Sequence, residues 1–123
     1  MIDHLSLGIG DLQKSRAFYD AALGALGYKR LREMDGALAY GQDEPVLWLA
    51  VTPHPVPPDP QSGLHLCFKA PDRASVDAFH RAALGAGGTD NGPPGPRAEY
   101  GPTYYAAFAI DPDGYRVEAV CYA

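Results

Sequence analysis

The chain has 123 residues, of which 46% are hydrophobic, and a formal net charge of −5. This length suits one compact domain whose core needs no disulfides, and we expect both cysteines, Cys67 and Cys121, to be reduced and buried. Scattered Lys and Arg residues argue against a nucleic-acid partner, and no apolar stretch approaches the roughly 20 residues that span a bilayer. The first residues lack the pattern of a signal peptide, so we expect a cytoplasmic protein without membrane contacts.

The first half of the chain, residues 1–52, predicts a strand, a helix and three more strands. Alternating β-prone residues indicate a strand over 2–9. Asp11 is a suitable N-cap for the helix that follows, and Gly27 is a typical helix end. Strands over 28–34 and 37–41 are joined by an Asp-Gly hairpin turn, and residues 46–52 form the last strand.

The second half, residues 63–123, follows a linker over 53–62 that contains five prolines. It predicts a strand over 64–69 and a helix from Asp72 to residue 86. A long Gly/Pro-rich loop over 90–102 comes next. Strands over 103–110 and 115–122 complete this half, joined by a type I turn with the sequence Asp-Pro-Asp-Gly.

The two halves are related by an offset of 61 residues. Seven of eleven positions are identical between 18–28 and 79–89, and the same offset carries His4 onto His65 and Asp11 onto Asp72. A duplication explains these coincidences best. We therefore predict a single α+β domain of tandem βαβββ modules, 1–52 and 63–123, with helices outside a cupped mixed sheet.

Three side chains carry the predicted chemistry. His4, His65 and Glu118 each lie in a strand and point away from its large aliphatic residues. A duplication would bring the paired histidines together, and two imidazoles with one carboxylate suit a single divalent ion of Fe, Mn, Zn, Ni or Co. The alternatives are hydrogen-bonded histidines and an ion pair of Glu118 with Arg116.

These features resemble the vicinal oxygen chelate superfamily, which includes glyoxalase I, extradiol dioxygenases and bleomycin resistance proteins. The resemblance rests on the βαβββ duplication, the histidine that opens each half and the stretch from Asp111 to Glu118, and it covers the whole chain. It implies that the metal binds on the concave side of the sheet and that the protein is a homodimer, sometimes with modules exchanged between chains. His4, His65 and Glu118 match three of the superfamily's metal positions.

The sequence also departs from that pattern. Matching Glu118 into the first half lands at or beside Trp48, so the carboxylate that serves glyoxalase I as fourth ligand and base is missing, and Glu44 is a turn residue. No histidine is placed to act as the acid–base catalyst of an extradiol dioxygenase, because His54 lies in the linker and His80 on the second helix.

Substrate contacts are expected from a lid formed by residues 90–105. Its length and Gly/Pro content are typical of a functional loop. Glu99 is a candidate base if the lid folds over the metal. The candidate substrate-binding residues are Trp48 as a pocket wall, Arg97 as an anion ligand, and Tyr100, Tyr104 and Tyr105.

Three functions remain open at this point. The first is a metal-dependent enzyme acting on a small molecule that chelates through neighbouring oxygens, with lyase, isomerase or ring-cleaving dioxygenase chemistry. The second is a metal-free small-molecule or antibiotic-binding protein. The third is a remnant of the fold in which the three residues form a hydrogen-bonded cluster. The fold does not select among these functions, because one scaffold hosts many reactions.

Overall fold

The computed structural model describes residues 1–123 as two βαβββ modules, as the repeat predicts. The first module contains β1 (Leu5–Ile9), α1 (Leu12–Gly24), β2 (Lys29–Met34), β3 (Ala37–Gly41) and β4 (Pro45–Val51). The second contains β5 (Leu66–Lys69), α2 (Arg73–Gly85), β6 (Thr89–Pro96), the 3-10 turn η1 (Ala98–Tyr100), β7 (Tyr104–Ile110) and β8 (Arg116–Tyr122). The α+β class and the tandem modules are confirmed.

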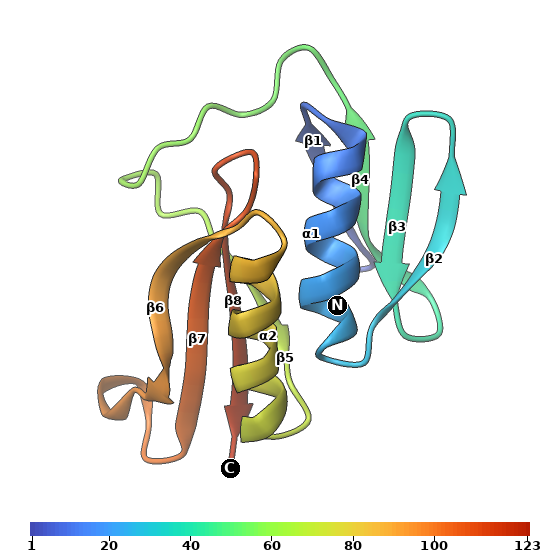
Figure 1. Ribbon diagram of the computed structural model, residues 1–123. Coiled ribbons are helices and arrows are strands. Elements are labelled where there is room, and N and C mark those ends of the chain that lie inside the picture. Colours follow the sequence, from blue (N-terminus) through green and yellow to red (C-terminus); the bar gives the residue numbers. More distant parts are fainter.

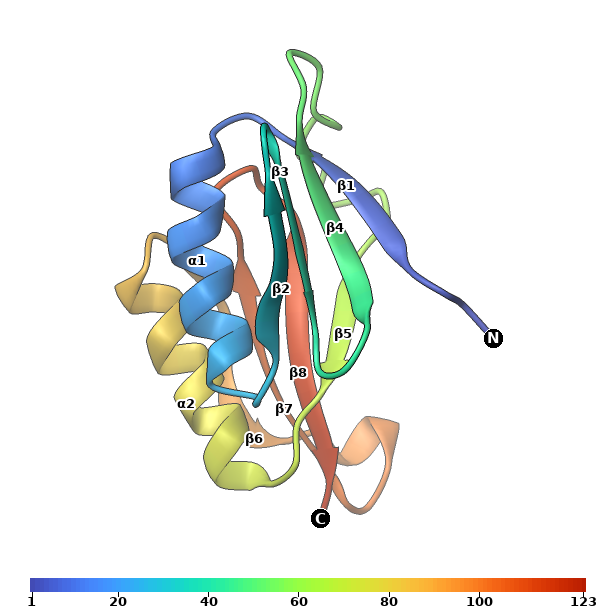
Figure 2. The same ribbon diagram turned by 90° about the vertical axis from the view of Figure 1, so that its right-hand side faces the viewer.

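Each module forms its own four-stranded mixed sheet, with strand orders β1-β4-β3-β2 and β5-β8-β7-β6. The first strand of each module pairs in parallel with the last, and the other neighbours are antiparallel. The two helices lie side by side between the modules (Figure 1) and in contact with each other. Both lie on the same side of the strands (Figure 2), so the opposite face of each sheet carries no helix.

The helices begin where the sequence predicts. Asp11 accepts a hydrogen bond from the Lys14 N–H at 3.0 Å, and Asp72 accepts one from the Ser75 N–H at 2.8 Å. These aspartates satisfy backbone donors that the first helical turn leaves without a partner. Both helices have 13 residues, and neither is long and apolar enough to cross a membrane.

One hydrophobic core joins the two modules. Phe18 and Tyr19 of α1 and Val76 and Phe79 of α2 belong to the same buried cluster, which also takes side chains from the strands of both sheets. The turn between β7 and β8 reaches across to the first module, where Asp113 Oδ1 accepts a hydrogen bond from the Gly10 N–H at 2.8 Å. The modules are therefore held together by apolar packing and by this turn.

The prediction that residues 90–105 form a loop that serves as a lid is wrong over most of that range. Residues 89–96 form β6, an edge strand paired with β7, and the register shifts between Asp90 and Gly92 and again between Gly92 and Gly95. The Gly/Pro content concealed this strand. Proline cannot donate a ladder hydrogen bond, but an edge strand tolerates it because one row of its backbone groups faces away from the sheet. Only the segment that contains η1 remains as a connection.

Gly24, the last residue of α1, provides a test of the helix end. A Cβ added there would meet nothing within 4 Å, whereas Gly27 has a φ of +90°. We expect Gly24→Ala to stabilise the protein by roughly 0.5–1 kcal/mol, because alanine restricts the unfolded chain and favours the helix. Gly27→Ala is the matched control and should destabilise by about 1 kcal/mol. Urea unfolding of both variants measures this, and equal effects would contradict the assigned helix end.

Candidate functional site

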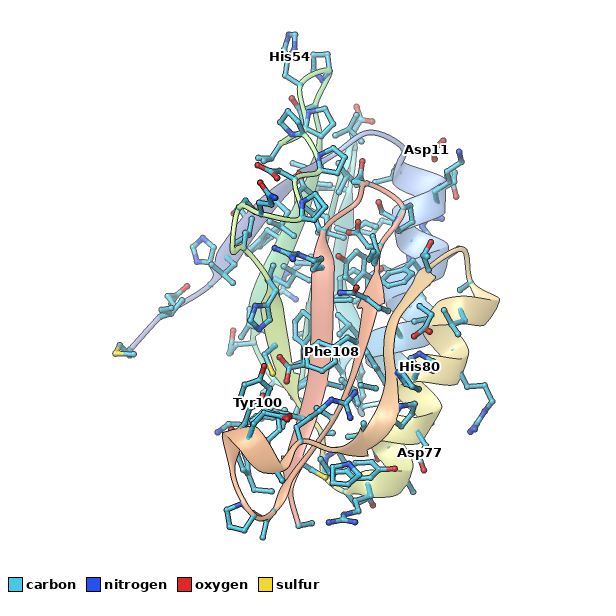
Figure 3. The ribbon with its side chains drawn as sticks, turned by 90° about the vertical axis from the view of Figure 1, so that its left-hand side faces the viewer. Asp11, His54, Asp77, His80, Tyr100 and Phe108 are labelled. Carbon is cyan, nitrogen blue, oxygen red and sulfur yellow. The ribbon has the colours of Figure 1, made fainter.

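The candidate site lies on the face of the second sheet that carries no helix. The strand register places Glu118 of β8 between Cys67 of β5 and Phe108 of β7. The neighbouring residues Ala107 and Ala119 point the other way and are buried in the core. Figure 3 shows Tyr100 on the opposite side of this sheet from His80 and Asp77, which lie along α2. The sheet thus presents Glu118 on its open face.

His65 and Glu118 form the centre of the site. The Nε2 atom of His65 lies 3.0 Å from Oε1 of Glu118, and the Tyr104 hydroxyl donates a hydrogen bond to Oε2. The Glu118 side chain is only 3% exposed, whereas that of His65 is 49% exposed. No Lys or Arg forms an ion pair with Glu118, so the predicted alternative of a pair with Arg116 is wrong. A buried carboxylate usually has a cationic partner, and here the protein supplies none apart from the imidazole.

Two further groups surround this carboxylate. Cys67 is exposed, not buried as predicted, because its side chain shares the open face with Glu118. Partial desolvation and the Glu118 carboxylate raise the pKa of the Cys67 thiol to about 12, so the thiol is protonated at neutral pH. Desolvation and the hydrogen bond to Glu118 likewise raise the pKa of Tyr104 well above its usual value. Both groups are therefore neutral at neutral pH and add no charge beside Glu118. Cys121 is buried, as predicted.

His4 does not join the other two predicted ligands within one chain. Strand β1 begins at Leu5, and the residues before it extend away from the body of the protein (Figure 2). The His4 Nδ1 atom lies 2.6 Å from Oδ1 of Asp3, and the side chain is 48% exposed. No group of three or more His, Cys, Asp or Glu side chains is gathered closely enough to hold a metal ion. A single chain thus brings together His65 and Glu118 only.

Trp48 occupies the place in the first sheet that Glu118 occupies in the second. Ser6 is paired with Trp48, and Cys67, which is 61 residues after Ser6, is paired with Glu118. The predicted match of Trp48 to Glu118 is confirmed. Trp48 is half-buried on the open face of the first sheet, and Glu44 lies in the turn before β4. The first module therefore offers no carboxylate at the equivalent position.

The predicted tyrosines divide between the two faces of the second sheet. Tyr104 contacts Glu118, and its ring lies 5.3 Å from that of Tyr100 between centroids. Tyr105 points to the helix side, where its hydroxyl donates to Oδ1 of Asp77 at 2.6 Å and its ring lies under the Arg73 guanidinium. Strand alternation turns adjacent residues to opposite faces, so Tyr105 does not lie beside Tyr104 and Glu118, and its role in substrate binding stays a prediction.

Two other predicted residues have different surroundings from those expected. The Arg97 guanidinium donates to the carbonyl oxygens of Pro93 at 2.7 Å and Gly95 at 3.0 Å, and it lies over the Phe108 ring. Its donors are largely used within the chain, so Arg97 is a scaffold for the irregular β6 rather than a free anion ligand. Glu99 lies exposed in η1 and makes no side-chain hydrogen bond or ion pair.

A cavity of about 330 Å³ opens beside His65. Its lining is polar and aromatic, and it is formed by the linker, β6, η1, β7 and the start of β8: Pro60, Gln61, Gly63, His65, Asn91, Tyr100, Phe108 and Arg116. The prediction identified His65 and Tyr100 but missed Asn91 and Phe108 as wall residues. Phe108 could have been found from its place directly opposite Glu118, whereas Asn91 lies in the stretch that was expected to be a loop.

A larger cavity of about 580 Å³ lies at the junction of the two modules. It is mostly apolar and includes Tyr28, Tyr40, Val46 and Phe68, with Cys67 at its edge. Neither His65 nor Glu118 lines it. The titratable groups in its lining are Lys69, Cys67 and the two tyrosines, whereas His65 and Arg116 line the smaller cavity.

Comparisons with known proteins place the chain in a family. The family model of the glyoxalase/bleomycin resistance protein/dioxygenase superfamily matches residues 1–119. No curated protein matches the chain. A glyoxalase/bleomycin resistance protein from Albidiferax ferrireducens T118 is similar in structure, with 32% identity, a TM-score of 0.84 and coverage of 96% of each chain.

Two further solved structures are similar to this chain. A glyoxalase-related enzyme from Fulvimarina pelagi has 20% identity and a TM-score of 0.75, and the match covers 98% of this chain and 86% of that one, which shows a common fold. A glyoxalase I mutant from Zea mays has 25% identity and a TM-score of 0.68. That match covers 95% of this chain but 45% of the maize chain.

Proposed function

Since the chain belongs to the glyoxalase/bleomycin resistance protein/dioxygenase superfamily, we propose that it is a divalent-metal-dependent enzyme acting on a small molecule with neighbouring oxygen atoms. One observation carries the proposal: the buried Glu118 carboxylate lies 3.0 Å from the accessible His65 imidazole and has no Lys or Arg partner. A divalent ion would supply the missing positive charge. The alternatives within this proposal are lyase, isomerase and ring-cleaving dioxygenase chemistry.

The donor set fits such an ion. An imidazole nitrogen and a carboxylate oxygen are ligands that Fe, Mn, Zn, Ni and Co all accept. When bound, the ion polarises a substrate oxygen as a Lewis acid. The Tyr104 hydroxyl holds one oxygen of Glu118 and leaves the other directed towards His65. Phe108 and Tyr100 form an apolar wall for the substrate beside this pair.

The third ligand in the proposal is His4 of a second copy of the chain. His4 is equivalent to His65 in the duplication, yet in one chain it projects on an extended segment whose Ile2 is 69% exposed. The exposed apolar residues of β1 and of the segment before it would be covered in a homodimer. A site shared between copies explains why His4 is exposed in a single chain.

A second candidate function is metal-free binding of a small molecule. It is favoured by the observation that one chain gathers only two ligands. In that case His65 and Glu118 are a hydrogen-bonded pair, and the cavity beside them binds its ligand without an ion.

The two candidates are separated by metal content and chelation. Untagged protein loaded with Fe(II), Mn(II), Zn(II) or Ni(II) should retain about one ion per chain after dialysis, by elemental analysis, if the proposal is right. The loaded protein should also shift the absorption band of 4-nitrocatechol, which chelates through two neighbouring oxygens, whereas the Glu118→Gln variant should not. Failure to retain any of these ions would leave the metal-free candidate.

Tyr104 provides a test of the carboxylate's orientation. We expect Tyr104→Phe to lower metal affinity roughly 10-fold or more, because loss of an outer hydrogen bond frees a ligand to rotate. Tyr105→Phe is the matched control, since Tyr105 lies on the other face and contacts Asp77. Competition against a chromophoric chelator measures both affinities. An equal loss in the two variants would contradict the assigned faces.

A further inference from the structure

Arg116 differs from the other half-buried arginines of the chain. Arg16 is paired with Glu33, and Arg97 is bound to backbone carbonyls. Arg116 is also half-buried, but its guanidinium has no hydrogen bond and no ion pair with any protein group. A guanidinium carries five donors and is always charged, so a partly desolvated one without an acceptor is a ready anion ligand.

The position of Arg116 relates this free cation to the proposed metal ligands. Arg116 lies two residues before Glu118 on β8, so both project from the same face about 7 Å apart along the strand. His65 and Arg116 line the same 330 Å³ cavity, which Tyr100 and Phe108 bound with aromatic rings. A ligand of the size of one aromatic ring could reach both ends of this cavity at once.

The polar lining of the cavity favours a negative group. Besides Arg116 and His65 it contains the amides of Gln61 and Asn91, and no Asp or Glu side chain lines it. Glu118 lies 3.0 Å from His65 but does not line this cavity. Asp59 lines the adjoining cavity with Arg116, makes no ion pair with it and accepts a hydrogen bond from the Gln61 N–H at 2.9 Å. Within this lining Arg116 is therefore the one side chain of fixed charge, and it is positive, in a chain whose net charge is −5.

We propose that Arg116 is a specificity-determining residue that binds an oxyanion of the substrate, a carboxylate or a phosphonate, at the end remote from the chelating oxygens. The inference rests on the proposed function, in which His65 and Glu118 hold the metal end. It narrows the substrate class to small anionic molecules, with an apolar or aromatic part that packs against Phe108 and Tyr100.

The test compares probes of one shape that differ in charge. Benzoate and benzamide are nearly isosteric, and phenylphosphonate adds the tetrahedral oxyanion. Calorimetric titration of the full chain, before and after metal loading, should give at least roughly 10-fold tighter binding of one of the two anions than of benzamide, since hydrogen bonds to a charged group are strong. Preference for benzoate or for phenylphosphonate identifies which oxyanion the site takes.

Variants assign this preference to Arg116. Arg116→Gln should bind the anion and benzamide equally, and Arg116→Lys should restore part of the preference because it keeps the charge but not the planar fork. Arg81→Gln is the control, since Arg81 is an exposed arginine of α2 without a partner. Because the Arg116 side chain makes no hydrogen bond or ion pair within the chain, Arg116→Gln should unfold at the same urea concentration as the unmodified chain.

The outcomes separate this inference from the proposed function. Equal binding of anions and benzamide by the unmodified chain, or an unchanged preference in Arg116→Gln, would overturn the role of Arg116 whatever the metal content. If the unmodified protein retains no stoichiometric metal after loading but still binds an anion more tightly than benzamide, the metal-dependent function alone would be overturned.

Discussion

Replacing His65 by alanine should lower the affinity of the protein for a divalent ion by at least roughly 100-fold, the largest functional effect of any single change that we expect. His65 supplies the only imidazole beside Glu118, and a carboxylate alone binds such ions weakly. Competition with a chromophoric chelator measures the affinity. His54→Ala is the matched control, because His54 lies exposed in the linker, and it should bind the ion normally. Undiminished affinity in His65→Ala would remove His65 from the site.

A heterodimer of two variants that each lack one proposed metal ligand tests whether the site is shared between copies of the chain. If His4 of one copy joins His65 and Glu118 of the other, His4→Ala and His65→Ala homodimers each lack a ligand at both sites. A heterodimer made by co-expression has both changes at one site and neither at the other, so it should regain one high-affinity ion per dimer. Purification with two different tags isolates this species. If the heterodimer does not regain this ion, His4 of one copy does not bind the metal at the site of the other copy.

Replacing Asp111 by alanine should destabilise the protein by about 3 kcal/mol, the largest effect on stability among these predictions. The Asp111 side chain is 4% exposed and accepts the Tyr19 hydroxyl at 2.5 Å and the N–H groups of Asp113 and Tyr115 at 2.9 Å each. Alanine would leave these donors without an acceptor, and a buried hydroxyl without a partner is costly. Urea unfolding measures the change.

The control and the cause of this effect can both be checked. Asp43→Ala, which removes an exposed aspartate that makes no side-chain hydrogen bond, should stay within about 0.5 kcal/mol of the unmodified chain. Tyr19→Phe combined with Asp111→Ala should cost less than the sum of the two changes, because each removes the same hydrogen bond. Additive effects would mean that this bond does not join α1 to the turn between β7 and β8.

Asp111 also bears on the site, because its turn holds the end of β8. Tyr115, the residue before β8, donates its hydroxyl to the Gly8 carbonyl at 2.6 Å, and Asp113 accepts from the Gly10 N–H. Both contacts cross from the second module to the first. The direction in which β8 presents Arg116 and Glu118 is thus set partly by the end of β1 and the residue after it. We therefore expect Asp111→Ala to weaken metal binding as well as the fold.

The repeat made most of the fold predictable. The pairing of Asp11 with Asp72 and of His4 with His65 followed from one offset, and both aspartates cap their helices. Local chemistry is sufficient for such features, because an N-cap or an Asp-Gly turn depends on a few adjacent residues. The match of Trp48 to Glu118 was also within reach, since strand register preserves the offset.

The predictions that failed mainly concern residues whose surroundings depend on contacts between strands of the sheet. Strand β6 was hidden by its prolines and glycines, because only its position at a sheet edge makes them tolerable. Arg97 was expected to be free, but the bulged path of β6 brings carbonyl oxygens to its guanidinium. Tyr105 was grouped with Tyr104 by proximity in sequence, although alternation sends its ring to the helix side.

By itself, the sequence determined that this protein consists of two βαβββ modules with a histidine at the start of each and one glutamate, Glu118, within the last strand. Only the tertiary structure decided which of these groups meet. His65 directly precedes β5, which pairs in parallel with β8, the strand that carries Glu118, so the pairing of these strands brings the two side chains together. His4 directly precedes β1 of the other sheet, and the two sheets are joined through their helices and core, so no strand pairing brings it to Glu118. The physical reason is that register follows from local patterns, whereas the approach of two sheets depends on everything packed between them.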